Sequence, residues 1–328
     1  MTGATGAGDG AWSYVLVTPD GVAGGVTGTV LGLVTEHGLR PLYCRPLGLD
    51  VGTMQEFYGG SASFRIQDPG RADFEFSWKT HEALYALAPA CLVLVSHDGD
   101  ACRAMLRCKG KTRPELADPG TVRHLGENVI FNLVHCPDDT ASARRELDLL
   151  LGPAEARRVR SLVPAADPRI GHLAGVDALR ASLPAAGTPE AISFPAIANR
   201  IRRRVVQVLA PGLPSSGLSA LTRAQRLLDD EERAFAAVRT SRERLLVAIA
   251  ADAAIAPELA AAAALRGAAE ITAGLAALSS LFRLGDVRRP EVVFALAGGG
   301  IYVSPLERVM VESHAYAFRL NGELAGLY

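Results

Sequence analysis

Residues 109–146 read KGKTRPELADPGTVRHLGENVIFNLVHCPDDTASARRE and bring a basic loop, an apolar run and a helix start close together. His135 stands at the end of the apolar run, which indicates a strand that ends in an imidazole. The preceding loop supplies cations and hydroxyls: Lys109, Lys111, Thr112, Arg113, Thr121, Arg123 and His124. An imidazole that faces such donors is suited to accept a phosphoryl group. The alternative is a core histidine beside a solvated basic loop.

Several motifs of the N-terminal half resemble those of the nucleoside diphosphate kinase family. They are residues 18–22 (TPDGV), residues 112–114 (TRP) with 119–123 (PGTVR), and residues 132–138 (NLVHCPD). The motifs follow one another in the family's order and at nearly its spacing. The resemblance covers about residues 12–151 and does not extend into the C-terminal half.

The resemblance implies an α+β fold, with a ferredoxin-like domain of the nucleoside diphosphate kinase type at residues 12–152. Apolar and β-branched runs predict strands at 12–17, 39–44 and 91–96, and a last apolar run at 128–134. Helices are predicted at 25–37, 51–58, 78–87, 100–107 and 141–151, with Gly38 ending the first. Compared with the family, residues 59–76 are an insertion.

The resemblance also implies a ping-pong phosphotransfer. In the family, a histidine takes the γ-phosphoryl group of a nucleoside triphosphate and passes it to a diphosphate, while magnesium bridges the phosphates. His135 matches that histidine. Glu146 matches a glutamate that accepts a hydrogen bond from the other ring nitrogen and so fixes the tautomer. From the pattern alone, Glu146 fits a solvated helix carboxylate equally well.

Further positions match residues that bind the nucleotide in the family. Thr112 and Arg123 match a threonine and an arginine that contact phosphate, and a hydroxyl and a guanidinium are suitable donors. Asn132 matches an asparagine on the sugar hydroxyl, and Tyr58 matches a tyrosine near the γ-phosphate. Trp78 falls near the phenylalanine on which the base stacks, although a core tryptophan fits this position as well.

Other family cations are replaced. The family's lysine before the P-D-G turn is Thr18, and an arginine before the asparagine is Phe131. A further phosphate-binding arginine falls on Leu106, so that Arg107 matches only after a shift of one residue. Losing one positioned donor costs about 10²–10³-fold in rate. Candidates to compensate are Arg103, Lys109, Lys111, Arg113 and the group Arg200, Arg202, Arg203 and Arg204.

The leading hypothesis is therefore a divergent phosphotransferase that uses ATP or another nucleoside triphosphate. Mg²⁺ would bind through the nucleotide phosphates, with no metal site made by the protein alone. The alternative is a nucleotide-binding regulatory protein with little turnover, in which the helical half binds a partner. A third possibility is a pure assembly module. The resemblance also implies a homo-oligomer, and nothing indicates a specific nucleic acid or a membrane as partner.

Composition fits a globular chain with more than one domain. The chain has 328 residues, 49% of them hydrophobic, and a formal net charge of -1, which gives no sign of general affinity for nucleic acid or membranes. Its five cysteines show no spacing typical of a zinc site or a disulfide framework, so free thiols in the cytoplasm are expected. Residues 1–11 are rich in small residues and are expected to be a disordered tail.

The C-terminal half is expected to be mainly α-helical over residues 196–328, after a connecting segment at 153–195 that is rich in proline and small residues. Apolar spacing predicts helices at 219–239, 241–252 and 257–284. Residues 245–265 are alanine-rich and interrupted by charges and Pro257, which favours a buried helix over a membrane span. Residues 290–303 suggest a hairpin, with the glycine triplet at 298–300 as a simple turn rather than a phosphate loop.

Overall fold

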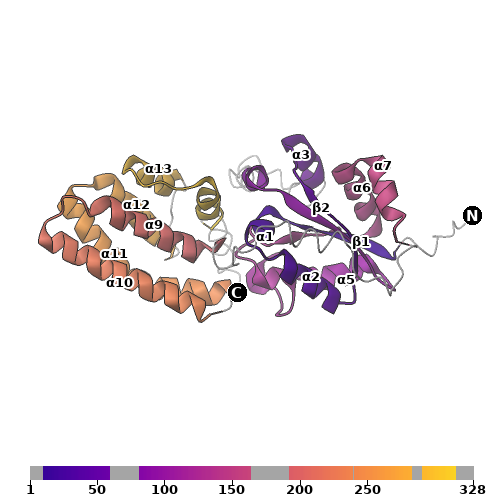
Figure 1. Ribbon diagram of the computed structural model, residues 1–328, viewed down its shortest axis with the longest axis horizontal. Helices are drawn as coiled ribbons and strands as arrows, with labels where there is room; N and C mark the ends of the chain where they lie inside the picture. The colour runs from indigo at the N-terminus through magenta and orange to yellow at the C-terminus, as the bar shows by residue number, and fades with distance from the viewer. Residues whose placement is uncertain (1–9, 60–80, 164–191, 239, 283–289, 315–328) are drawn as a thin grey trace, which may run out of the picture. The chain divides into compact units, whose positions relative to one another are not determined.

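The structure, a computed structural model, describes residues 10–59, 81–163, 192–238, 240–282 and 290–314. The chain divides into two compact units, Met1–Pro189 and Glu190–Tyr328 (Figure 1). Residues 1–9 of the expected tail, residues 60–76 of the expected insertion, and Trp78 lie outside the described residues.

A four-stranded antiparallel sheet forms the centre of the first unit, in the order β2-β3-β1-β4. Its strands are β1 (Trp12–Val17), β2 (Arg40–Leu47), β3 (Ala90–Ser96) and β4 (Val134–His135). The helices of this unit include α1 (Pro19–Ala23), α2 (Thr27–Glu36), α3 (Val51–Gly59), α5 (Ala101–Lys109), α6 (Thr140–Leu151) and α7 (Pro153–Arg160), and residues 81–87 are also helical. This order of strands and helices confirms the predicted ferredoxin-like α+β fold.

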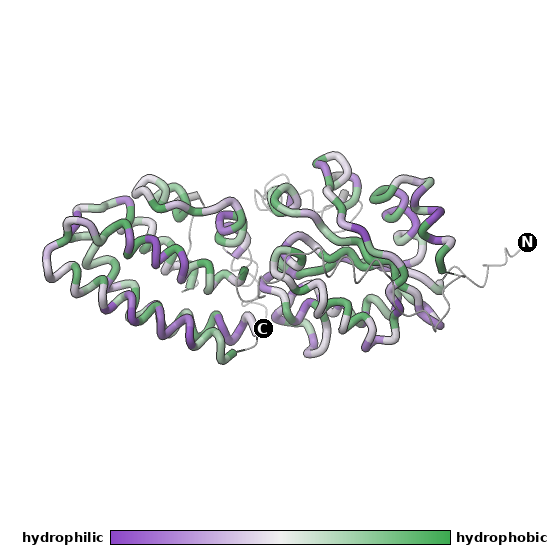
Figure 2. Tube along the Cα trace, viewed as in Figure 1, coloured by the Kyte–Doolittle hydropathy of each residue, from purple (hydrophilic) through white to green (hydrophobic). Residues whose placement is uncertain are grey.

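Each face of the sheet carries its own apolar cluster, because side chains alternate along a strand. Val15, Val17 and Val93 point to the face covered by α2 and α5. Tyr14 and Leu16 point to the opposite face, covered by α3, α6 and α7. The hydrophobic residues of the central strands are visible in the middle of this unit in Figure 2. Because the central strands β1 and β3 are buried along their whole length, the sheet is a rigid support for the side chains on its edge strands.

Local signals explain where the helices of the site begin and end. Asp100 caps α5 by accepting from the amide of Arg103 at 2.9 Å, and the helix ends before Gly110, whose φ is 80°. Asp139 caps α6 in the same way, accepting from the amide of Ser142 at 2.7 Å. Between the two helices, the basic loop forms short 3-10 turns at Pro114–Leu116 and Val122–Leu125.

The strand expected over residues 128–134 is much shorter than predicted. Only Val134 and His135 pair with β1, opposite Val17 and Leu16. The residues before them turn instead, because the side chain of Asn128 accepts from the amides of Ile130 and Phe131 at 2.9 and 3.0 Å. These apolar residues are buried as a loop rather than as a ladder, so their hydrophobicity misled the strand prediction.

Helix α7 occupies the first part of the segment expected to connect the two halves. It begins directly after Gly152 and Pro153 and packs against α6. Ala156 and Val159 are fully buried in the same apolar cluster as Tyr14 and Leu16. The described part of the first unit therefore extends through α7.

The second unit is a set of packed helices. Its helices include α9 (Phe194–Leu209), α10 (Ser215–Ala236), α11 (Ser241–Arg266), α12 (Ala269–Ser280) and α13 (Pro290–Gly298), and residues 305–314 are also helical. α10 lies along α11, and α9 contacts α10, α11 and α12. The buried face of α9, formed by Ile197, Ile201 and Val205, supplies the centre of this packing. The mainly helical prediction for this half is confirmed.

The course of helix α11 differs from the sequence prediction. α11 does not stop before Pro257, although a proline cannot donate the helical hydrogen bond to Ala253. The helix continues to Arg266 and ends before Gly267, whose φ is 70°. Packing of Ile255 and Leu259 on either side of the proline outweighs that missing bond.

The expected hairpin at 290–303 is instead α13 followed by a turn. Its chain reversal uses Gly300 (φ 79°) and a hydrogen bond from the Ile301 amide to the Leu296 carbonyl at 2.9 Å.

Helix α11 is also less buried than expected. It buries one face, which includes Ala248 and Ile255, while Leu246 is 58% exposed and Leu265 is 52% exposed. α11 is 26 residues long, and an 18-residue stretch of it has a mean hydropathy of 1.8. By length and composition it could cross a membrane, but core helices of soluble proteins meet the same criterion. Asp252, in the middle of the helix, is buried and paired with Arg202.

Candidate functional site

His135 lies at the end of β4, on the face of the sheet covered by α3 and α6. Aromatic rings surround it, with ring centroids at 4.8 Å for Phe57, 5.9 Å for Tyr58 and 6.4 Å for Tyr14. The side chain is 24% exposed, so part of the ring reaches the surface. This position suits a reactive group, since the ring is fixed by packing and still accessible.

Glu146 of α6 binds the imidazole of His135. Its Oε2 atom lies 3.0 Å from His135 Nε2, and the Tyr14 hydroxyl donates to the same oxygen. Arg145 donates to the other oxygen, Oε1, at 3.2 Å. Burial alone would raise the pKa of Glu146, but the hydrogen bonds from His135 and Tyr14 hold it below its usual value. Glu146 is therefore an ionised acceptor.

This contact determines which nitrogen of His135 can react. Burial lowers the pKa of His135, and the charges of Lys109 and Arg123 act in the same direction, against the opposing effect of Glu146. The imidazole is therefore neutral at pH 7. Because Glu146 accepts at Nε2, the ring proton resides on that atom, and Nδ1 carries the free lone pair.

The TPDG turn after β1 holds the residues that lead into β4. The amide of Thr18 donates to the Leu133 carbonyl at 2.9 Å, and the fully buried Asp20 accepts from the Leu133 amide at 3.0 Å. Leu133 has a φ of 73°, a left-handed conformation that these two bonds stabilise. A Cβ atom on Gly21 would lie 2.9 Å from the Leu133 oxygen, so glycine is required there. These contacts therefore fix the backbone conformation just before β4, the strand that carries His135.

Arg123 lies beside the backbone that carries His135. Its Nε and Nη2 atoms donate to the Val134 carbonyl at 3.3 and 3.0 Å, and its Nη1 atom donates to the Thr112 hydroxyl at 2.9 Å. Arg123 is 6% exposed, and although burial lowers its pKa, a guanidinium stays charged. The structure thus brings the predicted phosphate contacts Arg123 and Thr112 together, next to His135.

Asn132 closes the same loop from the other side. Its amide nitrogen donates to the carbonyl of Val129 at 2.7 Å and to that of Thr112 at 3.4 Å. The backbone around it is tightly packed, because a Cβ atom on Gly126 would lie 2.9 Å from the Asn132 Cα. Asn132 therefore shares Thr112 with Arg123, and the three residues form one connected group.

The domain that carries this group matches known proteins. A family model described as nucleoside diphosphate kinase matches residues 12–156. A nucleoside diphosphate kinase of Listeria monocytogenes serotype 4a (strain HCC23) is 30% identical over 150 residues, which cover 44% of this chain and 90% of that protein. The chain belongs to the nucleoside diphosphate kinase family. Another relative, the nucleoside diphosphate kinase of Methanosarcina acetivorans, is 32% identical over 136 residues, 41% of this chain and 83% of that protein.

Among solved structures, a transition state mimic of the nucleoside diphosphate kinase from Borrelia burgdorferi with bound vanadate and ADP is 22% identical. The similarity covers 44% of this chain and 88% of that chain, with a TM-score of 0.37. The family match ends within α7, so the α9–α13 helices lie beyond the nucleoside diphosphate kinase domain.

Other residues predicted from the family to bind the nucleotide differ in how far they are buried. Tyr58 forms a hydrogen bond with the hydroxyl of Tyr85 at 2.8 Å and stands edge-on to His135. Burial raises the pKa of Tyr58 to about 12, so its hydroxyl stays protonated. Arg107 lies on the exposed side of α5, whereas Lys109, two residues on, is buried. Trp78 is outside the described residues.

The positions where this nucleoside diphosphate kinase domain lacks a family cation are filled by uncharged side chains that are buried or partly buried. Thr18 is 5% exposed and Phe131 is 1% exposed. Leu106 packs against the apolar cluster of α2 and α5. Among the cations of the first unit proposed to compensate, Lys109 is the most buried, and its Nζ atom lies 3.6 Å from Asp138.

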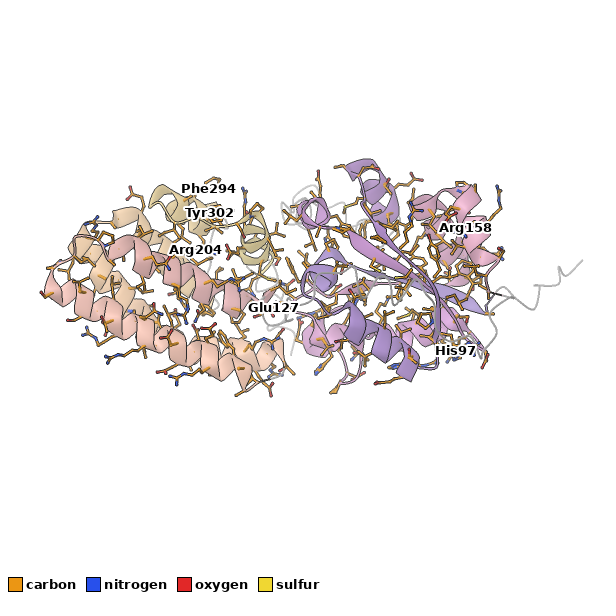
Figure 3. The ribbon with its side chains drawn as sticks, viewed as in Figure 1. His97, Glu127, Arg158, Arg204, Phe294 and Tyr302 are labelled. Carbon is orange, nitrogen blue, oxygen red and sulfur yellow. The ribbon has the colours of Figure 1, made fainter. Side chains whose placement is uncertain are left out.

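The remaining compensating candidates are less suited to bind phosphate in the described conformation. Arg103 and Lys111 are exposed, and Arg113 is paired with Glu115 at 2.6 Å. The arginines of α9 are engaged within the helical unit. Arg204, for instance, binds Glu307 at 2.7 Å and the Tyr302 carbonyl at 2.8 Å, in the area labelled in Figure 3.

No group of three or more metal-binding side chains occurs within the residues that the structure describes. The donors near His135 are cations and hydroxyls, which suit phosphate oxygens rather than a metal ion. Tyr14 and Asp20 are site residues that the sequence interpretation did not assign, and the TPDG motif was the one available signal for Asp20.

Proposed function

We propose that the nucleoside diphosphate kinase domain transfers a γ-phosphoryl group through a phosphohistidine on His135. Nδ1 attacks the γ-phosphorus of a magnesium-bound nucleoside triphosphate such as ATP, the N–P bond forms, and the bond to the bridging oxygen breaks. The nucleoside diphosphate leaves with that electron pair, and a second diphosphate or related acceptor then takes the phosphoryl group from the histidine.

One observation carries most of this proposal. The 3.0 Å contact between His135 Nε2 and the buried carboxylate of Glu146 leaves Nδ1 as the basic nitrogen of a neutral, partly exposed ring. As Nδ1 bonds to phosphorus, the ring becomes positively charged, and Glu146 stabilises that charge. Tyr14 orients Glu146 through its own hydrogen bond.

The surrounding donors would bind the nucleotide. Arg123 and Thr112 are placed to contact phosphate oxygens, Asn132 the sugar hydroxyl, and Tyr58 the γ-phosphate, as in the family. Because the cations at Thr18 and Phe131 are absent, and each is worth about 10²–10³-fold, we expect turnover well below that of a fully equipped enzyme. The buried charge of Lys109 is the best placed to compensate in part.

Incubation of the full chain with γ-labelled ATP and magnesium tests the proposal. We expect acid-labile, alkali-stable label on the wild-type chain, chased by a nucleoside diphosphate and absent from His135→Ala. The matched control is His97→Ala, because His97 is a histidine in the turn after β3 and not at the end of β4. His97 is labelled in Figure 3. Label that persists in His135→Ala would refute the assignment of the nucleophile.

The second candidate is a nucleotide-binding regulatory or assembly protein with little turnover. The buried, uncharged side chains at Thr18 and Phe131 favour it, because they remove charge from the transferring phosphate. Binding of nucleotide without any label on the chain would support it. As further proposals we place the protein in the cytoplasm and expect a homo-oligomer, which sedimentation of the full chain would test.

A further inference from the structure

Two cysteines lie against each other on neighbouring strands. Cys44 of β2 and Cys91 of β3 have sulfur atoms 3.2 Å apart. In the antiparallel register Cys44 is opposite Val93 and Pro46 is opposite Cys91, so the two thiols lie on a diagonal between the strands. Both pack into the apolar cluster on the α2 and α5 face, which means that they point to the same side of the sheet.

This arrangement is close to that of a disulfide. A disulfide bond is about 2.0 Å long, so the sulfurs need to approach by only about 1.2 Å more. β2 is an edge strand of the sheet and pairs with β3 alone among the described strands. Its register is irregular between Pro41 and Tyr43, just before Cys44. An edge strand held from one side can make this small adjustment more easily than the central strands.

We propose that Cys44 and Cys91 form a redox-active pair that closes to a reversible disulfide when a hydroperoxide reaches it. The sulfur of Cys44 attacks a peroxide oxygen, the O–O bond breaks, and Cys44 becomes a sulfenic acid with release of one water, or of an alcohol from an organic peroxide. The sulfur of Cys91 then attacks the sulfenic sulfur, the S–O bond breaks, and a water leaves with the Cys91 proton. The thiols lose two electrons in total, and the peroxide gains them.

The environment of each thiol supports this order. Cys44 is partly exposed and can meet the oxidant, whereas Cys91 is 1% exposed. The hydrogen bond with Cys44, together with burial, raises the pKa of Cys91, so Cys91 is not the thiol that reacts first.

The other cysteines are less suited than Cys44 to meet the oxidant first. Cys102, Cys108 and Cys136 are all buried. Burial raises the pKa of Cys102, raises that of Cys108 to about 12 and raises that of Cys136 to about 11. Because the thiolate is the reactive form, we expect oxidation to begin at the partly exposed Cys44 and to continue to Cys91, whose sulfur is 3.2 Å away.

The bond would join positions 47 residues apart in the chain and tie the edge strand to the centre of the sheet. The segment that it encloses contains α3, whose Phe57 and Tyr58 pack against His135. Closing a loop of this length restricts the unfolded chain, so the oxidised protein should melt about 5–10 °C higher than the reduced protein.

The test treats the full chain with hydrogen peroxide and maps its cysteines by mass spectrometry. We expect the loss of two of the five thiols and of two hydrogen atoms in mass, with one link between Cys44 and Cys91 that dithiothreitol reverses. Cys44→Ser should prevent the link, and the matched control Cys102→Ser should retain it. The melting temperature should rise on oxidation of wild type and of Cys102→Ser, and not of Cys44→Ser.

The proposal is overturned if the folded chain keeps all its thiols under peroxide. It is equally overturned if the link joins other cysteines or two chains, or if Cys44 proceeds to sulfinic acid without a link. Serine is close in size to cysteine and Cys44 is partly exposed, so the variant should fold. If it does not, the linkage map of the wild-type chain decides by itself.

Discussion

Replacing Glu146 with glutamine tests the contact on which the phosphotransfer proposal depends. Glutamine keeps the size of the side chain and an oxygen that can accept from Tyr14, but it removes the negative charge 3.0 Å from His135 Nε2. A hydrogen bond to a charged group contributes about 1.5–3 kcal/mol. If that contribution is realised as the ring becomes positive, phosphorylation of His135 should slow by roughly 10–150-fold.

The same substitution has a defined effect on pH dependence. Burial already lowers the pKa of His135, and the carboxylate of Glu146 opposes that effect. Removing the carboxylate therefore lowers the pKa further. Since the neutral ring is the nucleophile, the acidic limb of the phosphorylation rate should move to lower pH in Glu146→Gln, even though the rate on the plateau falls.

Rapid-quench labelling with ATP measures the rate, and nitrogen-detected NMR of the imidazole measures the pKa and the tautomer. The matched control is Asp148→Asn, which removes a carboxylate from the same helix, where it pairs with Arg160 at 2.7 Å rather than with His135. This control should react like the wild type. A Glu146→Gln rate within about twofold of wild type, or a wild-type ring proton on Nδ1, would refute the reasoning.

Three further substitutions test other parts of the structure. Lys109→Met should raise the pKa of His135 in an NMR titration, because the charge of Lys109 lowers it. Gly110→Ala should lower the free energy of unfolding by about 1–3 kcal/mol in urea titrations, since Gly110 has a φ of 80° and its Cβ would lie 2.5 Å from the Thr121 hydroxyl. Arg202→Met should lower it by about 3–5 kcal/mol by leaving buried carboxylates unpaired.

Matched controls separate these effects from general damage. Gly120 also has a positive φ, of 85°, but no atom lies within 4 Å of its Cβ position, so Gly120→Ala should cost less than Gly110→Ala. Arg223→Met removes an exposed pair with Glu258 and should change stability by less than about 1 kcal/mol. Equal losses in Gly110→Ala and Gly120→Ala would show that the contact with Thr121 is unimportant. An unchanged His135 titration in Lys109→Met would contradict the assigned influence of that charge.

The sequence predicted most of the first unit because its signals are local. The buried runs at 12–17 and 91–96 and the glycine at position 38 after α2 each depend on neighbouring residues. The family motifs also identified His135 and Glu146, which the structure brings into contact.

The missed features depend on residues far apart in the chain. Tyr14 binds Glu146 across 132 positions, and Asp20 binds Leu133 across 113, so neither contact leaves a local pattern. The length of β4 was overestimated because apolar residues are buried equally well in a loop or a strand. α11 passes through Pro257 for a similar reason, since tertiary packing outweighs a local preference.

Burying a charged side chain costs free energy of folding, so the buried Glu146 needs an explanation beside the missing cations at Thr18 and Phe131. Glu146 is 7% exposed and its carboxylate binds the imidazole of His135 and the phenol of Tyr14. Its charge is not needed for stability, because well-packed apolar side chains would be at least as stable at this position. Thr18 and Phe131 show that other family positions have changed to uncharged side chains without disturbing the fold. Glu146, by contrast, is a charged side chain at a buried position, and a protein without phosphotransfer would have no need of that charge. The buried charge at Glu146 supports the proposal that His135 carries the phosphoryl group, and the uncharged Thr18 and Phe131 support weaker binding of the transferring phosphate.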